Sequence, residues 1–259
     1  MSAPEPALSI VIPAYNEERR LPPTLEKIAA WLRVKGIAAE VLVVDDGSTD
    51  GTASLVERAA AAFPGLRLIP NGRNFGKGYS VRHGMREARG RVALFTDADL
   101  SAPIEEADKL LAALENADVA FGSRALDRSL ISTHQSRLRE LAGIFFNKLV
   151  QAVLWIPFVD TQCGFKAFRM ERARILFEQQ RIERFGFDPE LLYLARHHGL
   201  RAVEIPVRWA HHPETKVNVY RDSVRMFAEL FTIRWNSLCG RYPRRNAAPS
   251  PRSMRGGSG

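Results

Sequence analysis

Residues 41–48, VLVVDDGS, decide the fold class of this chain. Four apolar, mostly β-branched residues in a row are typical of a strand that is buried on both faces, and the acidic end with a glycine is typical of a turn. Residues 92–99, VALFTDAD, repeat this arrangement, with a buried strand that ends in two carboxylates. Strands buried on both faces belong mainly to parallel sheets covered by helices. The two segments therefore predict an α/β protein.

Outward from these strands, apolar runs alternate with helical patterns. We expect further strands at 8–12, 66–69, 119–121 and 203–209, and helices at 24–35, 52–63, 104–114, 137–158, 188–198 and 223–235. Such alternation predicts a Rossmann-like, mostly parallel sheet flanked by helices. Polar residues at the carboxyl ends of its strands should then meet in one crevice.

The length and composition predict one globular domain. Of the 259 residues, 46% are hydrophobic and 25% are charged, which allows a sizeable core. We expect a flexible N-terminus at 1–7, a single domain at 8–242 and a disordered basic tail at 243–259. The two cysteines lack metal-site spacing and suit a reducing cytoplasm. No apolar run approaches the roughly 18–20 residues that cross a bilayer, so we expect no integral membrane segment.

The net charge of +8 is unevenly distributed. From Tyr220 to the C-terminus, eight arginines stand against two acidic residues. A basic tail suits nucleic acid, an anionic membrane surface or an acidic substrate, or it only solubilises the protein. Because the basic residues are not interleaved with aromatic stacking platforms, we expect no nucleic-acid partner.

Asp97-Ala98-Asp99 is the strongest local signal for chemistry. Two carboxylates one residue apart at a strand end can bind Mg²⁺ or Mn²⁺ together with substrate phosphates. Such an ion neutralises the charge that grows on a departing nucleoside diphosphate. An acidic turn alone also explains the pattern. At the end of the other strand, Asp45 and Asp46 either bind a base or ribose or close an Asx turn. Lys77, in a glycine-rich segment before a helix, could reach a phosphate.

Together with residues 12–18, IPAYNEE, and Gly76-Lys77-Gly78, these segments resemble the inverting GT-A glycosyltransferases of family 2 in order and spacing. Gly122-Ser123-Arg124, residues 160–166 (DTQCGFK) and residues 187–192 (FDPELL) are similar to the polyprenyl-phosphate glycosyltransferases. The dolichyl-phosphate β-glucosyltransferase branch is the most similar, and the dolichyl-phosphate mannosyltransferases are near relatives. The resemblance covers about 8–242 and implies a GT-A fold with C-terminal amphipathic helices.

The resemblance also implies a role for each matching position. On the donor side, Pro13, Tyr15 and Glu17 line the nucleotide pocket, Asp45 or Asp46 binds the base and ribose, Lys77 approaches a phosphate, and Asp97, Ala98 and Asp99 hold the metal and diphosphate. On the acceptor side, the candidates to bind a phosphate are Arg124, Arg139 and Lys216. Asp160 is the candidate base or sugar-orienting carboxylate. Asp188 and Glu190 lie close to the sugar. Surface solvation is the alternative role for these cations.

The activity implied by the resemblance is transfer of a hexose, from UDP-glucose or else GDP-mannose, to a polyprenyl phosphate with inversion. A phosphate monoester needs hardly any general base, because its second pKa is about 6. The alternative is a cytoplasmic family 2 transferase with a soluble or glycan acceptor. Residues 144–158 are strongly apolar and form either an interfacial helix that seats the lipid or a helix that covers the core. We expect a cytoplasmic protein held peripherally on the inner face of the membrane.

Overall fold

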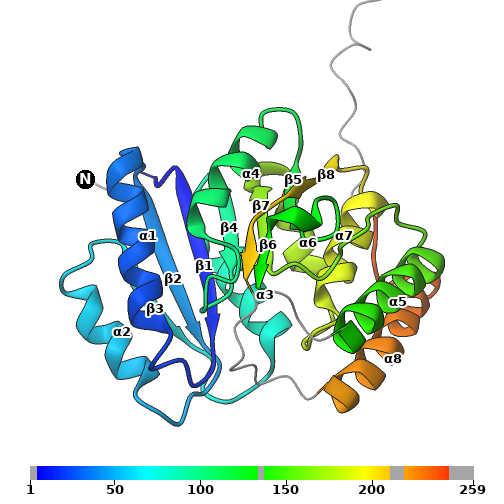
Figure 1. Ribbon diagram of the computed structural model, residues 1–259, viewed down its shortest axis with the longest axis horizontal. Coiled ribbons are helices and arrows are strands. Elements are labelled where there is room, and N and C mark those ends of the chain that lie inside the picture. Colours follow the sequence, from blue (N-terminus) through cyan, green and yellow to red (C-terminus); the bar gives the residue numbers. More distant parts are fainter. Residues whose placement is uncertain (1–4, 134–136, 211–218, 245–259) are drawn as a thin grey trace, which may run out of the picture.

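A computed structural model describes residues 5–133, 137–210 and 219–244 and contains a seven-stranded sheet of order β3-β2-β1-β4-β7-β5-β8 (Figure 1). The strands are β1 Leu8–Ala14, β2 Ala39–Asp45, β3 Leu66–Pro70, β4 Val92–Thr96, β5 Val119–Ser123, β7 Phe165–Arg169 and β8 Ala202–Pro206. All neighbours are parallel except β7, which runs antiparallel to β4 and β5. The predicted α/β class with a mostly parallel sheet is therefore confirmed.

Helices cover both faces of this sheet, because successive side chains of a strand point to opposite faces. On β1, Ile10 and Ile12 pack on one face and Val11 on the other. The first face carries α1 Leu21–Lys35, α2 Thr52–Ala60, the 3-10 turn η1 Ile104–Glu106 and α4 Ala107–Ala113. The second face carries α3 Lys77–Glu87, α5 Arg137–Leu154, α6 Met170–Gln179, α7 Phe187–His197 and α8 Val219–Leu238.

Some elements differ from the expected ones. The strand expected at 203–209 divides into β8 and β9 Trp209–Ala210, because β9 leaves the main sheet and pairs with β6 Ile131–Thr133, which follows the 3-10 turn η2 Arg128–Leu130. The helix expected at 137–158 ends at Leu154, and Trp155 then takes a left-handed φ of 56°. Strands β6 and β7 and helix α6 are additional to the expected elements. The flexible N-terminus and basic tail expected from the sequence fall largely on 1–4 and 245–259, outside the described residues.

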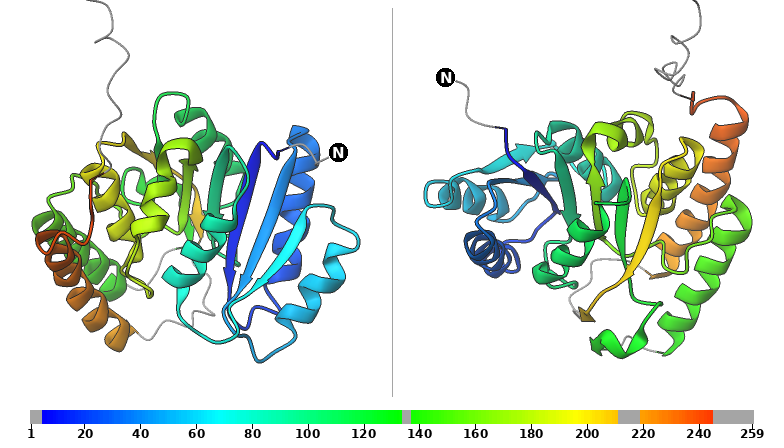
Figure 2. Two further views of the ribbon diagram at one scale, coloured as in Figure 1. Left: turned by 180° about the vertical axis from the view of Figure 1, so that it is seen from behind. Right: turned by 90° about the horizontal axis from the view of Figure 1, so that it is seen from above.

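Helices α5 and α8 lie side by side at the end of the molecule away from α1 and α2 (Figures 1 and 2). Each helix buries one face, with Val150 and Leu154 from α5 and Leu230 and Ile233 from α8 in the core. Residues 144–158 therefore do cover the core, as one of the two interpretations predicts. Large apolar side chains of the same helices are also exposed.

Candidate functional site

The loops that follow β1 and β2 are tied together at the carboxyl edge of the sheet. The backbone N–H of Asn16 donates to Ser48 Oγ (2.8 Å), and Asn16 Oδ1 accepts from the backbone N–H of Thr49 (2.7 Å). Asn16 has a left-handed φ of 54°, which asparagine tolerates better than most residues. This edge carries the predicted nucleotide-pocket positions Pro13, Tyr15, Glu17, Asp45 and Asp46.

Asp45 ends β2 in a tight turn. Its carboxylate accepts from the hydroxyl of Ser48 and, at 3.2 Å, from the backbone N–H of the same residue. Gly47 has a left-handed φ of 72°, and a Cβ there would lie 2.6 Å from the backbone of Arg73. Asp45 therefore closes a turn at the strand end, as the structural interpretation predicts, although its bond reaches the N–H three residues on rather than the two of an Asx turn, and its contact with a base or ribose stays a prediction.

Asp46 organises the glycine-rich segment before α3. Its Oδ1 accepts from Asn71 Nδ2 (2.9 Å) and from the backbone N–H of Phe75 (3.0 Å), and its Oδ2 accepts from the backbone N–H of Gly76 (2.8 Å). The residue is only 3% exposed. Asp46 thus fixes the segment that leads into Lys77, and its contact with a base or ribose stays a prediction.

The Asp97-Ala98-Asp99 segment follows β4 and is held by three side chains from other elements. Thr24 of α1 donates its hydroxyl to the carbonyl of Ala98 (2.7 Å). Lys77 Nζ lies 2.6 Å from Asp97 Oδ1, and Arg20 Nη1 lies 3.7 Å from Asp99 Oδ2. Burial works against the charge of Lys77, but Asp97, together with Asp188 and Asp99, outweighs it, so the pKa of Lys77 is raised. Two carboxylates and two cations therefore share this strand end.

The two carboxylates fit a divalent cation that shares its ligands with a substrate diphosphate. The side chains of Asp97 and Asp99 remain 34% and 19% exposed, so an incoming ion can reach both. Within the described parts of the chain, no three or more His, Cys, Asp or Glu side chains gather to hold a metal without help. Mg²⁺ often binds through one or two carboxylates plus substrate phosphates. Asp97 and Asp99 are therefore the residues that could hold Mg²⁺ or Mn²⁺.

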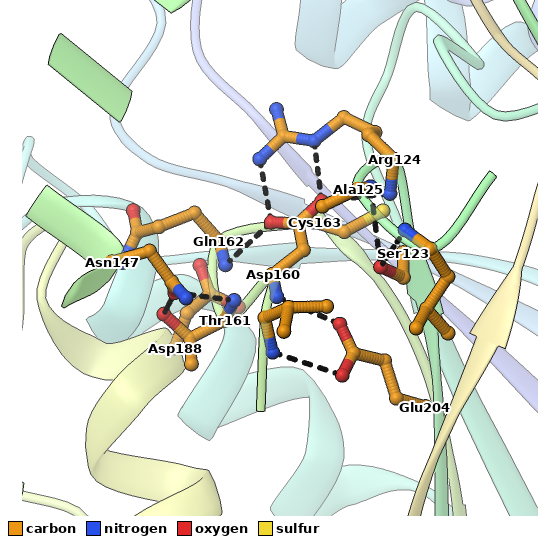
Figure 3. A network of polar contacts seen from close by, with 12 residues as sticks. Ser123, Arg124, Ala125, Asn147, Asp160, Thr161, Gln162, Cys163, Asp188 and Glu204 are labelled. Carbon is orange, nitrogen blue, oxygen red and sulfur yellow. Dashed lines mark hydrogen bonds and ion pairs between the residues drawn. The ribbon is translucent and has the colours of Figure 1, made fainter. Parts of the chain in front are cut away.

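Arg124 follows β5 and forms a two-point ion pair with Asp160 (Figure 3). Its Nε lies 2.7 Å from Oδ2 and its Nη2 lies 2.8 Å from Oδ1, and the backbone N–H of Arg124 also donates to Oδ2 (2.9 Å). Burial alone would raise the pKa of Asp160, but the guanidinium outweighs it and holds that pKa below its usual range. The other terminal nitrogen, Nη1, has no hydrogen-bond partner among the described residues.

Glu204 of β8 holds the segment that carries Asp160. Its carboxylate accepts from the backbone N–H of Val159 (3.0 Å) and from that of Asp160 (2.7 Å), as Figure 3 shows for Asp160. Asn147 of α5 holds the next residue, because its Oδ1 accepts from both the backbone N–H (3.1 Å) and the hydroxyl (2.9 Å) of Thr161. The segment before β7 is thus anchored to α5 and β8.

Lys166 of β7 anchors the same segment from inside the fold. Its Nζ donates to the carbonyl oxygens of Thr161 (3.3 Å) and Cys163 (2.6 Å) and pairs with Asp188 Oδ1 at 2.5 Å. Asp188 stands in the first turn of α7. Burial raises the pKa of the Cys163 thiol to about 12, so the side chain packs as a small buried hydrophobe rather than as a reactive thiolate.

Of the other expected site residues, one lies elsewhere in the fold and two cannot be placed from the described residues. Glu190 accepts from the backbone N–H groups of Arg181 and Ile182 (both 2.9 Å) and from the hydroxyl of Tyr242 (2.6 Å), so it braces the C-terminal part of the fold. Arg139 belongs to α5, but its side chain lies outside the described residues. Lys216 lies outside them altogether.

Three residues of the site were missing from the expected set. Arg20 binds Glu17 through two nitrogens at 2.6 and 2.5 Å and also faces Asp99. Its position three residues after Glu17 is the sequence signal of this pairing. Lys166 is a charge inside an apolar run, which signals a buried cation with a partner. Glu204 carries no local signal, because its role depends on the neighbouring position of β5 and β8.

Comparison with known proteins shows the family of this chain. The model of "Glycosyl transferase family 2" matches residues 9–176. Dolichyl-phosphate β-glucosyltransferase of Drosophila melanogaster is 39% identical over 256 residues, which are 92% of this chain and 77% of the relative. The Homo sapiens protein of the same name is 34% identical over 253 residues, 92% of this chain and 78% of that one.

A solved structure shares the fold. Glucosyl-3-phosphoglycerate synthase from Mycobacterium tuberculosis, in complex with Mn²⁺, UDP and glucosyl-3-phosphoglycerate, superposes with a TM-score of 0.63 at 19% identity, covering 93% of this chain and 82% of that chain. The GT-A fold is therefore shared, while the sequence relationship rests on the nearer relatives. The family match covers most of the chain, and the relatives are matched over most of their length. The chain therefore belongs to glycosyl transferase family 2 and, within it, to the dolichyl-phosphate β-glucosyltransferase branch.

Proposed function

We propose that this glycosyltransferase moves glucose from UDP-glucose to a polyprenyl phosphate such as dolichyl phosphate, with inversion at the anomeric carbon. The observation that carries the proposal is the arrangement at one edge of the sheet. Asp97 and Asp99 follow β4, and Arg124, whose Nη1 binds none of the described residues, follows β5. The names of the relatives support glucose and dolichyl phosphate. The UDP of the solved neighbour supports a uridine donor over GDP-mannose.

On the donor side, the reaction needs positive charge around the diphosphate. A Mg²⁺ or Mn²⁺ ion held by Asp97 and Asp99 would neutralise the charge that develops on the leaving diphosphate. Lys77 is placed to contact a phosphate oxygen, because it stands at the N-terminus of α3 beside Asp97. Arg20 keeps Asp99 and the loop after β1 in contact.

On the acceptor side, the structure supports a nucleophile that is already ionised. An oxygen of the acceptor phosphate forms a bond to the anomeric carbon while the bond from that carbon to the diphosphate oxygen breaks, and the bonding electron pair leaves with UDP. Asp160 is a poor general base, because Arg124 holds its pKa low and occupies both of its oxygens. A phosphate monoester needs no such base at neutral pH. We assign Arg124 Nη1 to the acceptor phosphate and Asp188 to the donor sugar.

A soluble acceptor is the second candidate. The solved neighbour carries glucosyl-3-phosphoglycerate, a product whose acceptor is small and soluble. Both acceptors bear a phosphate, so Arg124 would serve either one. The choice between them rests on the surface formed by α5 and α8.

That surface supports a peripheral membrane contact. Ile144 and Phe145 of α5 and Phe231 and Trp235 of α8 are between 45% and 70% exposed. Val224, Phe227 and Leu238 extend the stripe along α8 at helical spacing, and Trp155 follows α5. We call these eight side chains the apolar α5–α8 face. Contiguous exposed apolar side chains mark a binding surface on a soluble protein.

We infer that the apolar α5–α8 face rests in the headgroup region and brings the polyprenyl chain to the site. Arg234 lies over the ring of Trp155 at 4.6 Å, and Arg225 is half exposed, so cations border the face. Apolar side chains bordered by arginine suit an anionic leaflet such as the cytoplasmic one. Among the residues that the structure describes, no helix is long and apolar enough to cross a membrane.

A radiolabelled transfer assay tests the function. Purified protein receives labelled UDP-glucose or GDP-mannose, Mg²⁺ or Mn²⁺, and either polyprenyl phosphate in detergent or 3-phosphoglycerate. We expect label from UDP-glucose in the organic phase, and none after EDTA. Label that stays in a water-soluble product would replace the lipid by a soluble acceptor, and transfer from GDP-mannose alone would replace the donor.

Vesicle flotation tests the membrane contact. The wild-type protein should float with vesicles that contain anionic lipid and bind neutral vesicles less. Phe231→Ser with Trp235→Ser should abolish flotation, because both side chains are exposed and their loss removes apolar contact with lipid. Val34→Ser is the matched control, since Val34 is an 84% exposed apolar residue on α1, away from this face. Equal flotation of the double variant and the control would contradict the contact.

A further inference from the structure

We propose that Lys166 is a positioning residue of the transferase, which holds Asp188 and the segment from Asp160 to Gly164 in the arrangement that the reaction needs. The proposal rests on the proposed function only for the identity of the substrates. Lys166 is fully buried, with 0% exposure, so it reaches no substrate itself. Its influence must pass through the groups that it binds.

The surroundings of Lys166 make an unpartnered charge there very unfavourable. In the antiparallel register of β7, Lys166 stands between Phe95 of β4 and Phe121 of β5. Its Nζ lies 5.4 Å from the centre of the first ring and 6.0 Å from that of the second. A charge in such apolar surroundings persists only when it is paired and hydrogen-bonded. A lysine at this position therefore signals that the ammonium has a specific task.

The hydrogen bonds of Lys166 show what that task is. An ammonium has three N–H donors, and all three have acceptors: the carbonyls of Thr161 and Cys163 and the carboxylate of Asp188. The two carbonyls belong to the loop before β7, and the carboxylate belongs to α7. Lys166 therefore joins two segments that are far apart in the chain. Methionine would fill the same space but leave all three buried acceptors without donors.

The loop that Lys166 holds connects the two halves of the site. It begins at Asp160, which binds Arg124 through both oxygens. It ends at Gly164, whose Cα lies so close to the Asp97 carboxylate that a Cβ would overlap it. A shift of this loop would thus change the distance between the acceptor cation and the donor carboxylates. Because rates depend steeply on such alignment, the loss should appear in kcat.

Kinetics of Lys166→Met separate this role from a structural one. Full-length protein is assayed for kcat and KM with UDP-glucose, for UDP affinity with Mn²⁺ and for thermal unfolding. We expect kcat to fall at least about tenfold while KM and the Kd for UDP stay within about twofold. Lys35→Met is the matched control, because Lys35 forms a similar pair with Asp108 (2.7 Å) at an exposed position, and its kcat should not change.

Each result decides the proposal. A folded Lys166→Met protein with a kcat within about threefold of wild type, or with its loss confined to KM, would overturn it. If Lys166→Met does not fold, the double variant Lys166→Met with Asp188→Asn tests the proposal instead. The double variant leaves no unpaired buried charge. Its kcat should fall at least about threefold below that of Lys166→Gln with Asp188→Asn, which also leaves no buried charge but keeps a side-chain amide that can donate to the loop carbonyls. Equal rates, or failure of the double variant to fold, would leave Lys166 a purely structural role.

Failure of the proposed acceptor is a separate outcome. If wild type transfers nothing to polyprenyl phosphate, the proposed function is wrong in its acceptor. The same variants are then compared by metal-dependent hydrolysis of UDP-glucose without lipid. A tenfold loss in that assay would still support the positioning role of Lys166, and an unchanged rate would contradict it.

Discussion

Asp46 and Asp160 are buried carboxylates on opposite sides of the site, and they are held by different kinds of partner. On the side formed by β1 and β2, Asp46 accepts from backbone and amide N–H groups, all of them neutral. On the side formed by β5 and β7, Asp160 binds Arg124 and Asp188 binds Lys166. Neutral donors fix the shape of a loop, whereas ion pairs also set the local charge.

The two kinds of partner suit different tasks of the two sides of the site. In the proposed reaction, the β1–β2 side would hold a neutral base and sugar, for which rigid loops suffice. The β5–β7 side would bring an anionic acceptor toward an anionic donor, and cations there would reduce the repulsion. Asp97 and Asp99 stand between the two sides, each beside a partly exposed cation. We therefore expect variants of the central carboxylates to affect catalysis most and variants of the neutral side to affect stability.

The largest effect is expected for Asp99→Asn. Loss of one carboxylate weakens the metal site, whose charge stabilisation amounts to several kcal/mol, so kcat should fall by about 100-fold or more. Thermal unfolding should change little, because the ion pair that Asp99 forms within the described residues is long, with Arg20 Nη1 3.7 Å from Oδ2. Asp108→Asn is the matched control, because Asp108 is an exposed carboxylate outside the site. Activity within about threefold of the control would remove Asp99 from the metal site.

Arg124→Lys should have the next largest effect. Lysine cannot bind both oxygens of Asp160 and also offer a nitrogen to the acceptor. We expect kcat/KM for polyprenyl phosphate to fall by about 10- to 100-fold, while KM for UDP-glucose stays nearly constant. Arg128→Lys, at an exposed arginine paired with Glu140, is the control. An equal loss of kcat/KM for polyprenyl phosphate and for UDP-glucose would contradict a specific role of Arg124 in binding the acceptor.

Asp46→Asn tests the β1–β2 side, where the carboxylate is held by neutral donors. Asparagine would direct an N–H group at a backbone N–H donor, so one buried donor loses its acceptor and unfolding should become easier by about 1–3 kcal/mol. Urea unfolding measures this loss, with Asp108→Asn again as control. If kcat falls strongly while stability is kept, Asp46 belongs to the chemistry and the comparison fails.

The smallest effect concerns pH. Because Arg124 holds the pKa of Asp160 below its usual range, the pair stabilises the folded state above the ordinary aspartate pKa of about 3.9, and this stabilisation is lost as pH falls through the lowered value. The difference in free energy of unfolding between wild type and Asp160→Asn should stay constant from about pH 7 to pH 5 and shrink below about pH 4. A difference that shrinks between pH 7 and pH 5 would mean that the pKa is raised.

The strand ends were predictable because apolar runs are local. Residues 41–44 and 92–95 are buried strands, and a parallel sheet necessarily brings their carboxyl ends to one edge. The position of Asp97 and Asp99 beside Lys77 follows from that rule. The choice of partners within the edge does not follow from it. Asp45 and Asp97 both follow directly on strand residues, but the Asp45 carboxylate accepts a hydrogen bond from Ser48 in its own turn.

By itself, the sequence determined the α/β class, the order of the parallel strands along the chain and the carboxylates at their ends, since buried strands and turns are marked by neighbouring residues. Only the tertiary structure decided the role of β7 and its lysine. The charge of Lys166 interrupts the apolar pattern, so the strand is concealed in the sequence. Its partners, Asp188 and the carbonyl of Cys163, reach it only after α7 and the loop before β7 have packed. A buried charge is stable only with such partners, and they come from distant parts of the chain.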